Sequence, residues 1–226
     1  MNMRITLLSF LFLFNITLHQ AAVAQNNGFT IGLSTMWPYY GLSQKDDGSA
    51  TLSTAIDLGY RTYILKNAHL STGFSGFFEL YDCPFTLAGS KDPKDALKPL
   101  KSLYGTTVFT GIGITPSWCF NPDGDWTFSV AVKLKAGNYY GLGIVQGQDA
   151  AGNTINYDKQ SANAGLGMAW SPRLVLERDI DSQSIGLLIG WDSTDFGKGV
   201  RSLRSTYYPN QTYSSSAIVL GVIVVL

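Results

Sequence analysis

Residues 126–135 read WTFSVAVKLK, a stretch in which every second side chain is apolar. The apolar members are Trp126, Phe128, Val130, Val132 and Leu134. The residues between them are small, hydroxylated or charged, and they include Lys133. Because successive side chains of a β-strand point to opposite faces of the sheet, this alternation predicts a strand with one apolar and one polar face.

The same alternation recurs eight times between Phe29 and Leu226. The alternating segments are residues 30–37, 52–64, 70–80, 108–118, 126–135, 165–177, 185–192 and 217–226. Segments of about ten residues with this pattern are typical of barrels whose apolar rows face lipid and whose polar rows face the lumen. The sequence therefore predicts an all-β fold, an eight-stranded antiparallel up-and-down transmembrane β-barrel.

The connections between the segments predict which end of the barrel faces outward, because such barrels have short periplasmic turns and longer extracellular loops. The short connections, expected on the periplasmic side, are residues 66–69, 121–125 and 179–183. The long connections, expected outside, are residues 41–50, 83–105, 138–160 and 193–214. Residues 91–98 have the composition of a short surface helix.

Aromatic residues gather near the segment ends, which predicts two interfacial belts. The residues expected at the outer rim are Trp37, Tyr39, Tyr40, Tyr81, Tyr139, Tyr140 and Trp191. The residues expected toward the inner rim are Tyr63, Trp118, Phe120, Trp126 and Trp170.

Residues 1–24 have the three parts of a cleavable export signal: Arg4, an apolar stretch at 5–18, and Ala22-Val23-Ala24. The apolar stretch is shorter than the roughly 20 residues that a transmembrane helix needs. We therefore expect a signal peptide at 1–24 and an outer-membrane β-barrel at 25–226.

The composition limits the partners of the chain. Charged residues make up only 14% of it, fewer than a water-soluble surface usually carries. The 16 basic residues balance the 16 acidic ones, so no nucleic-acid partner is expected.

The predicted lumen rows carry charged residues away from the outer rim. They are Asp57, Arg61, Glu79, Lys133, Arg173 and Glu177. Charges held away from bulk water must pair to avoid a large desolvation cost, so these three acids and three bases predict an internal salt-bridge network. The alternative role for the same residues is a gated polar path for transport.

Candidates for chemistry are few. His69, the one histidine after the signal, lies in the first short turn, far from the outer rim where an acyl-transfer site of a barrel enzyme would need its base. Cys83 and Cys119 fall at opposite rims, so two free thiols are expected. We expect no catalytic site, no metal and no cofactor.

Three basic residues in the last long connection are candidates for contact with lipopolysaccharide phosphates. They are Lys198, Arg201 and Arg204, which are spaced by three. The alternative is a loop whose charges only keep it solvated.

The segments from Phe29 to Leu226 resemble the small eight-stranded outer-membrane barrels of Gram-negative bacteria, the group of the OmpA transmembrane domain, OmpX and OmpW. The resemblance rests on architecture. It implies a monomer in the outer membrane, in contact with lipid and lipopolysaccharide, whose last strand (218–226) is read by the barrel-insertion machinery. It also implies a non-enzymatic role, in which the barrel presents extracellular loops for envelope integrity, adhesion or ligand contact.

Three other functions stay open on the sequence. Resemblance to OmpW implies a conduit for small hydrophobic molecules along the apolar lumen residues Val219, Ile223, Val225, Phe77 and Phe109. A soluble barrel of the lipocalin type would turn the apolar rows inward to hold a ligand. A barrel enzyme that modifies lipid A would need catalytic groups in the outer connections.

Overall fold

The computed structural model describes residues 27–38, 53–65, 69–85, 91–92, 95–120, 126–148, 151–180, 183–203 and 216–226. The expected signal peptide lies outside these residues and stays a prediction. No helix among the described residues has both the length and the apolar character needed to cross a membrane.

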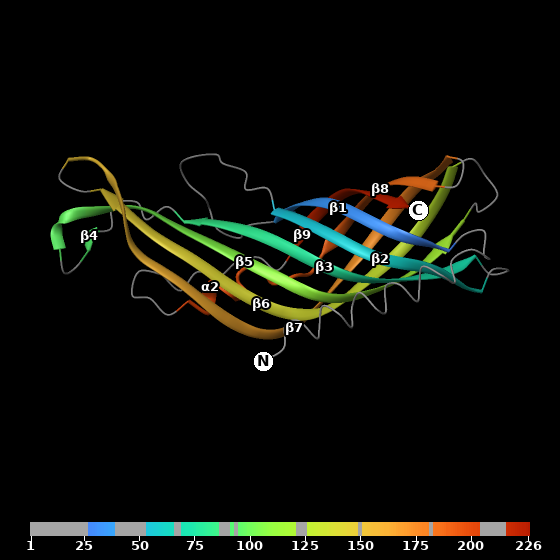
Figure 1. Ribbon diagram of the computed structural model, residues 1–226, viewed down its shortest axis with the longest axis horizontal. Helices are drawn as coiled ribbons and strands as arrows, with labels where there is room; N and C mark the ends of the chain where they lie inside the picture. Colours follow the sequence, from blue (N-terminus) through green and yellow to red (C-terminus); the bar gives the residue numbers. More distant parts are fainter. Residues whose placement is uncertain are drawn as a thin grey trace.

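Eight strands form one closed antiparallel barrel (Figure 1). They are β1 (Gly28–Pro38), β2 (Ser53–Leu65), β3 (Leu70–Phe85), β5 (Asp95–Cys119), β6 (Trp126–Gln148), β7 (Thr154–Ile180), β8 (Gln183–Asp192) and β9 (Ala217–Val225). Strands that follow one another in the chain pair with each other, and β1 pairs with β9 to close the wall. A short additional strand, β4 (Lys91–Asp92), pairs with β5. The predicted eight-stranded antiparallel up-and-down barrel is confirmed.

The two rows of each strand face the directions that the sequence predicts. On β8, Leu187 keeps 61% of its surface exposed, whereas the next residue, Leu188, keeps 6%. The same alternation of exposed and buried residues runs through most of β8. The outer wall is therefore apolar and exposed, and the inner wall carries the small and polar rows.

Three strands are much longer than predicted. β5, β6 and β7 have 25, 23 and 27 residues, and Figure 1 shows them extending past the other strands toward β4. The long connections expected at residues 83–105 and 138–160 are therefore wrong over most of their length. The helix expected at 91–98 is also wrong, because residues 91–92 and 95–98 are strand.

The reason for this difference is that backbone pairing continues where the apolar row ends. Tyr104 still pairs with Ile144, and Gly143 pairs with Gln160. Backbone hydrogen bonds form whatever the side chains are, so these stretches can pair without the alternation that revealed the other strands.

The segment after β8 turns into the barrel instead of forming an outer loop. It includes a single-turn helix, α2 (Lys198–Arg201), which contacts β5, β6 and β7. Phe196, Val200 and Leu203 of this segment are buried. The expectation of an outer loop at 193–214 is therefore wrong for residues 193–203, while residues 204–214 lie outside the described part.

A pair of glycines allows this close approach. A side chain on Gly199 would meet the carbonyl oxygen of Tyr140 and the side chain of Thr107, and one on Gly141 would meet the carbonyl oxygen of Gly199. The Val200 amide also donates to Thr107 Oγ1 at 3.3 Å. Backbone packs directly on backbone here, which fixes the depth of the segment in the lumen.

The predicted aromatic belts hold only in part. Trp37, Trp118 and Trp126 lie exposed on the outer wall. Tyr81 and Tyr139, expected at the outer rim, are instead buried in the lumen. Residues an even number of positions apart on a strand face the same side of the sheet. Tyr81 follows the inward-facing Glu79 by two residues and Tyr139 follows Lys135 by four, so both tyrosines face the lumen.

Candidate functional site in the barrel lumen

The lumen holds a balanced set of charged side chains. Among the residues that the structure describes, its inward rows carry Asp57, Arg61, Glu79, Lys133, Lys135, Arg173, Glu177 and Asp192. Four are acids and four are bases. They form ion pairs at three levels along the barrel.

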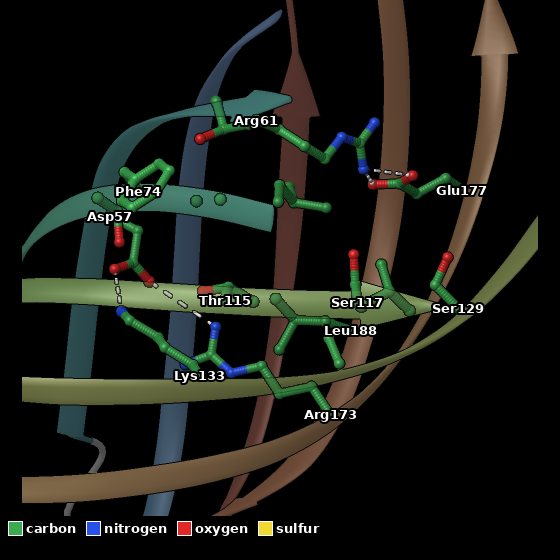
Figure 2. A pocket seen from close by; sticks show the side chains of 17 residues that line it. Asp57, Arg61, Phe74, Thr115, Ser117, Ser129, Lys133, Arg173, Glu177 and Leu188 are labelled. Carbon is green, nitrogen blue, oxygen red and sulfur yellow. Dashed lines mark hydrogen bonds and ion pairs between the residues drawn. The ribbon is translucent and has the colours of Figure 1, made fainter. Parts of the chain in front are cut away.

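The first level lies near the end of the barrel that holds both described chain ends. Arg61 on β2 reaches across the lumen to Glu177 on β7, and its Nη1 donates to both carboxylate oxygens at 2.7 and 2.8 Å (Figure 2). The two strands are separated in the wall by β1, β9 and β8. This ion pair therefore ties opposite sides of the barrel together.

The second level centres on Asp57. Its carboxylate accepts a hydrogen bond from Lys133, and Arg173 Nη1 lies 3.9 Å from its other oxygen (Figure 2). Arg173 also donates through Nε to Ser171 Oγ at 3.2 Å. One carboxylate thus serves two cations from β6 and β7.

A cavity of about 80 Å³ lies between the first two levels. Hydroxyl groups of Thr115, Ser117 and Ser129 line it beside the ion pairs (Figure 2). One water needs about 10–15 Å³, so the cavity has room for several. The inner part of the lumen therefore holds a small chamber whose lining combines charged and hydroxyl groups with apolar side chains such as Val175 and Leu188.

The third level is sealed from solvent. Lys135 donates to both oxygens of Glu79 at 2.8 and 2.9 Å and to Asp192 Oδ2 at 2.7 Å. Thr194 Oγ1 accepts from Lys135 at 2.8 Å and donates to Asp192 at 2.5 Å, while Tyr81 donates to Glu79. The side chains of all three charged residues are 0–1% exposed, so these hydrogen bonds offset a large loss of hydration.

Aromatic rings surround the third level. Phe77 lies between two levels, with its ring centre 4.9 Å from Lys133 Nζ and 5.8 Å from Lys135 Nζ. Phe109 stacks on Tyr139 with ring centres 4.0 Å apart. Phe196 packs on Tyr81 at 4.3 Å, which joins the inward-turned segment to this cluster.

All six lumen residues singled out from the sequence take part in ion pairs, but two essential partners were missed. Lys135 was missed because β6 was expected to end near it, whereas the strand continues to Gln148. Asp192 was missed because it stands at the end of β8, where a solvated rim was expected. The alternation of side chains along each strand could have identified both residues, because each lies on an inward row.

The apolar lumen residues of the proposed conduit are packed rather than open. Phe77, Phe109 and Val219 belong to one buried cluster, and Ile223 packs against it. Val225 is also buried. These side chains fill space in the lumen.

Two of the three basic residues singled out in the last connection already have partners within the protein. Lys198 Nζ donates to the carbonyl oxygen of Leu166 at 2.6 Å and lies 4.8 Å from the ring centre of Tyr139. Arg201 pairs with Asp195, and Arg204 lies outside the described residues. Contact of this group with lipopolysaccharide stays a prediction.

Of the remaining candidates for chemistry, His69 and Cys119 are neighbours at one end of the barrel, and Cys83 lies far from both. His69 is in the turn before β3, and its carbonyl oxygen accepts from the amide of Cys119. Cys119 is a buried free thiol. Cys83 pairs in the sheet with Gly105, thirteen residues along β3 from Leu70 at the His69 end.

No protein-family model matches the chain, and no curated protein matches it. Neisserial surface protein A (NspA) superimposes with a TM-score of 0.42 and 9% identity, covering 88% of this chain and 96% of NspA. Ail, the attachment invasion locus protein of Yersinia pestis, superimposes with a TM-score of 0.36 and 10% identity, covering 88% of this chain and 95% of Ail. Its complex with the heparin analogue sucrose octasulfate gives 0.38 and 11% over the same shares. Likeness at this level carries no argument about function.

Proposed function

We propose that this protein is a non-enzymatic outer-membrane β-barrel that presents its protruding strands and outer connections for envelope integrity, adhesion or ligand contact. The observation that carries the proposal is the contrast between its two surfaces. The outward rows expose large apolar side chains on every strand of the wall, whereas the lumen is filled by paired charges and packed rings.

The apolar outer wall supports a location in lipid. Leu33, Leu58, Leu166 and Met168 each expose half or more of their surface. Monomeric soluble proteins rarely expose a contiguous apolar patch larger than a few hundred Å². In a bilayer the same surface needs no water, and a closed barrel leaves no unpaired strand edge in the lipid.

The filled lumen supports a scaffold over a lipocalin-like carrier or a hydrophobic conduit. Three of the five apolar residues that would line a conduit, Phe77, Phe109 and Val219, belong to one packed cluster with Tyr139 and Phe196, and Ile223 packs against it. A lipocalin would need a chamber large enough for its ligand, about 300–1,000 Å³, whereas the chamber here measures about 80 Å³ and has Arg61, Lys133 and Glu177 in its lining. We infer that the barrel wall is rigid and that the ion pairs in the lumen hold its strands in position relative to one another.

The three long strands support a role outside the membrane. A membrane-spanning strand needs about 9–11 residues, and β5, β6 and β7 have more than twice that number. Their outer halves would stand above the bilayer as a sheet. The wider expectations also belong to this proposal: a monomer, insertion by the barrel machinery, and contact with lipid and lipopolysaccharide.

A lysine placed at the middle of the outer wall tests the membrane location. Leu58 lies near the middle of β2 and faces outward, 50% exposed. In a bilayer, Leu58→Lys should lower the free energy of unfolding by about 2–4 kcal/mol, the cost of a cation near the midplane. Urea unfolding in phospholipid vesicles, followed by tryptophan fluorescence, measures this change.

The matched control is Leu142→Lys, at an outward position on the protruding part of β6. It should change the free energy of unfolding by less than about 0.5 kcal/mol, as surface substitutions usually do. Equal effects of the two lysines, or a mature protein that stays monodisperse without detergent, would contradict the proposal.

A further inference from the structure

The outer wall carries an apolar groove of about 440 Å³ across β6 to β9. The outward-facing side chains that line it are Phe128, Leu174, Leu176, Leu187, Ile189 and Leu220. Its volume lies within the range of about 300–1,000 Å³ that ligand-binding pockets occupy. Leu174 and Leu176 follow one another on the outward row of β7 within the groove, so an apolar chain can pass along this strand toward its end.

A cation stands at one end of this groove. Leu176 pairs in the sheet with Phe128 and Leu187, and Arg178, two residues further along β7, faces outward beside them. Arg178 is exposed, and its guanidinium carbon lies 5.5 Å from the ring centre of Trp126. A tryptophan with an arginine is typical of the interface between hydrocarbon and headgroups.

The position of Arg178 decides which leaflet it meets. β7 ends two residues later, at Ile180, on the side of the barrel that has the short connections. Under the proposed function this is the periplasmic side, so Arg178 lies at the headgroup level of the inner leaflet. The neighbouring carboxylate of Asp179 belongs to the opposite row of the strand and does not face the groove.

We propose that the groove and Arg178 form a binding site for one phospholipid of the inner leaflet. An acyl chain lies along Leu174 and Leu176, and the phosphate binds the guanidinium of Arg178. Arginine suits this role because its planar fork donates two parallel hydrogen bonds to a phosphate. The inference rests on the proposed membrane location and adds a specific lipid partner to it.

Native mass spectrometry of the full chain, purified in detergent and titrated with palmitoyl-oleoyl phosphatidylglycerol, tests this site. The wild type should retain one such lipid. Arg178→Gln should weaken that binding about fivefold, the loss expected for one basic residue at a lipid surface. Arg178→Lys should recover only part of it, because the charge is kept but the planar fork is lost.

Two controls keep the result interpretable. Asp179→Asn removes the neighbouring exposed charge on the opposite row of β7 and should leave lipid retention unchanged. Glycerol 3-phosphate has the phosphate without the acyl chains, so it should bind much more weakly than the lipid. Equal retention of phosphatidylglycerol by the wild type and Arg178→Gln would overturn the site, as would equal binding of glycerol 3-phosphate.

This outcome is separate from a failure of the proposed function. If Leu58→Lys destabilises the barrel in vesicles while Arg178→Gln keeps its lipid, the membrane location stands and the lipid site falls. If Leu58→Lys has no effect in vesicles, both fall together.

Discussion

Replacing Lys135 with methionine should lower the free energy of unfolding by about 3–5 kcal/mol, the cost of removing one partner from a buried ion pair. The Lys135 side chain is fully buried, and its ammonium group lies between Glu79 and Asp192. Methionine keeps most of the length and apolar contact of lysine, so packing changes little. Two carboxylates would then share a dry site without a cation. Urea unfolding in vesicles, followed by tryptophan fluorescence, measures the loss.

The matched control is Arg201→Gln, which also removes one cation from an ion pair. Arg201 and its partner Asp195 are 41% and 37% exposed, so this change should cost about 0–1 kcal/mol. If the two substitutions cost the same, the third level of the lumen is hydrated and its charges do not depend on one another.

A combined variant separates lost charge balance from lost packing. Lys135→Met together with Glu79→Gln and Asp192→Asn removes all three charges and keeps groups of similar size. Most of the lost stability should return, because breaking a buried pair costs more than replacing all of its members by neutral groups. A triple variant no more stable than Lys135→Met would contradict this account.

How much of the fold could be predicted from the sequence depends on the role of each row of side chains in the strands. The parity of a strand fixes which side chains face the same way, so the outward Leu187 and the inward Leu188 follow from the alternation alone. Strand length could not be predicted in the same way. Where β5, β6 and β7 continue past the apolar rows, backbone pairing continues with them, and backbone pairing does not depend on an alternating side-chain pattern.

The lumen shows a similar division. That inward charges should pair follows from desolvation, and the inward rows show which residues are concerned. Which charge meets which depends on the strands that face each other across the barrel. Arg61 and Glu177 are 116 positions apart and lie on β2 and β7, a pairing that no local pattern encodes.

The sequence of residues 193–203 contains a weak indication that this segment turns into the lumen. Phe196, Val200 and Leu203 are apolar residues within a polar stretch, at spacings that place them on one side of a helical turn. A solvated loop has no reason to carry such a cluster. The stretch is too short for the pattern to be distinguished from chance without the lumen wall that it covers.

Replacing Phe196 with alanine should release this segment from the lumen. Phe196 is fully buried against the ring of Tyr81, and a Phe→Ala change in a core costs about 3–5 kcal/mol. Other contacts also hold the segment, among them the hydrogen bond of the Val200 amide to Thr107 and the bond of Lys198 to Leu166, but Phe196 is its largest fully buried side chain. Hydrogen–deuterium exchange should show that the amides of residues 193–203 lose their protection.

Phe120→Ala is the control, because it removes a phenylalanine that is 53% exposed on the outer wall. It should leave the protection of residues 193–203 unchanged, and unchanged protection in Phe196→Ala would show that the segment is held by other contacts. The segment also supplies Thr194 to Lys135 and Asp192. Its release should therefore admit water to the third level, so that Lys135→Met costs less in the Phe196→Ala background than in the wild type. Such non-additivity is expected when two sites share a network of contacts, and it would connect closure of the lumen to the charges beneath it.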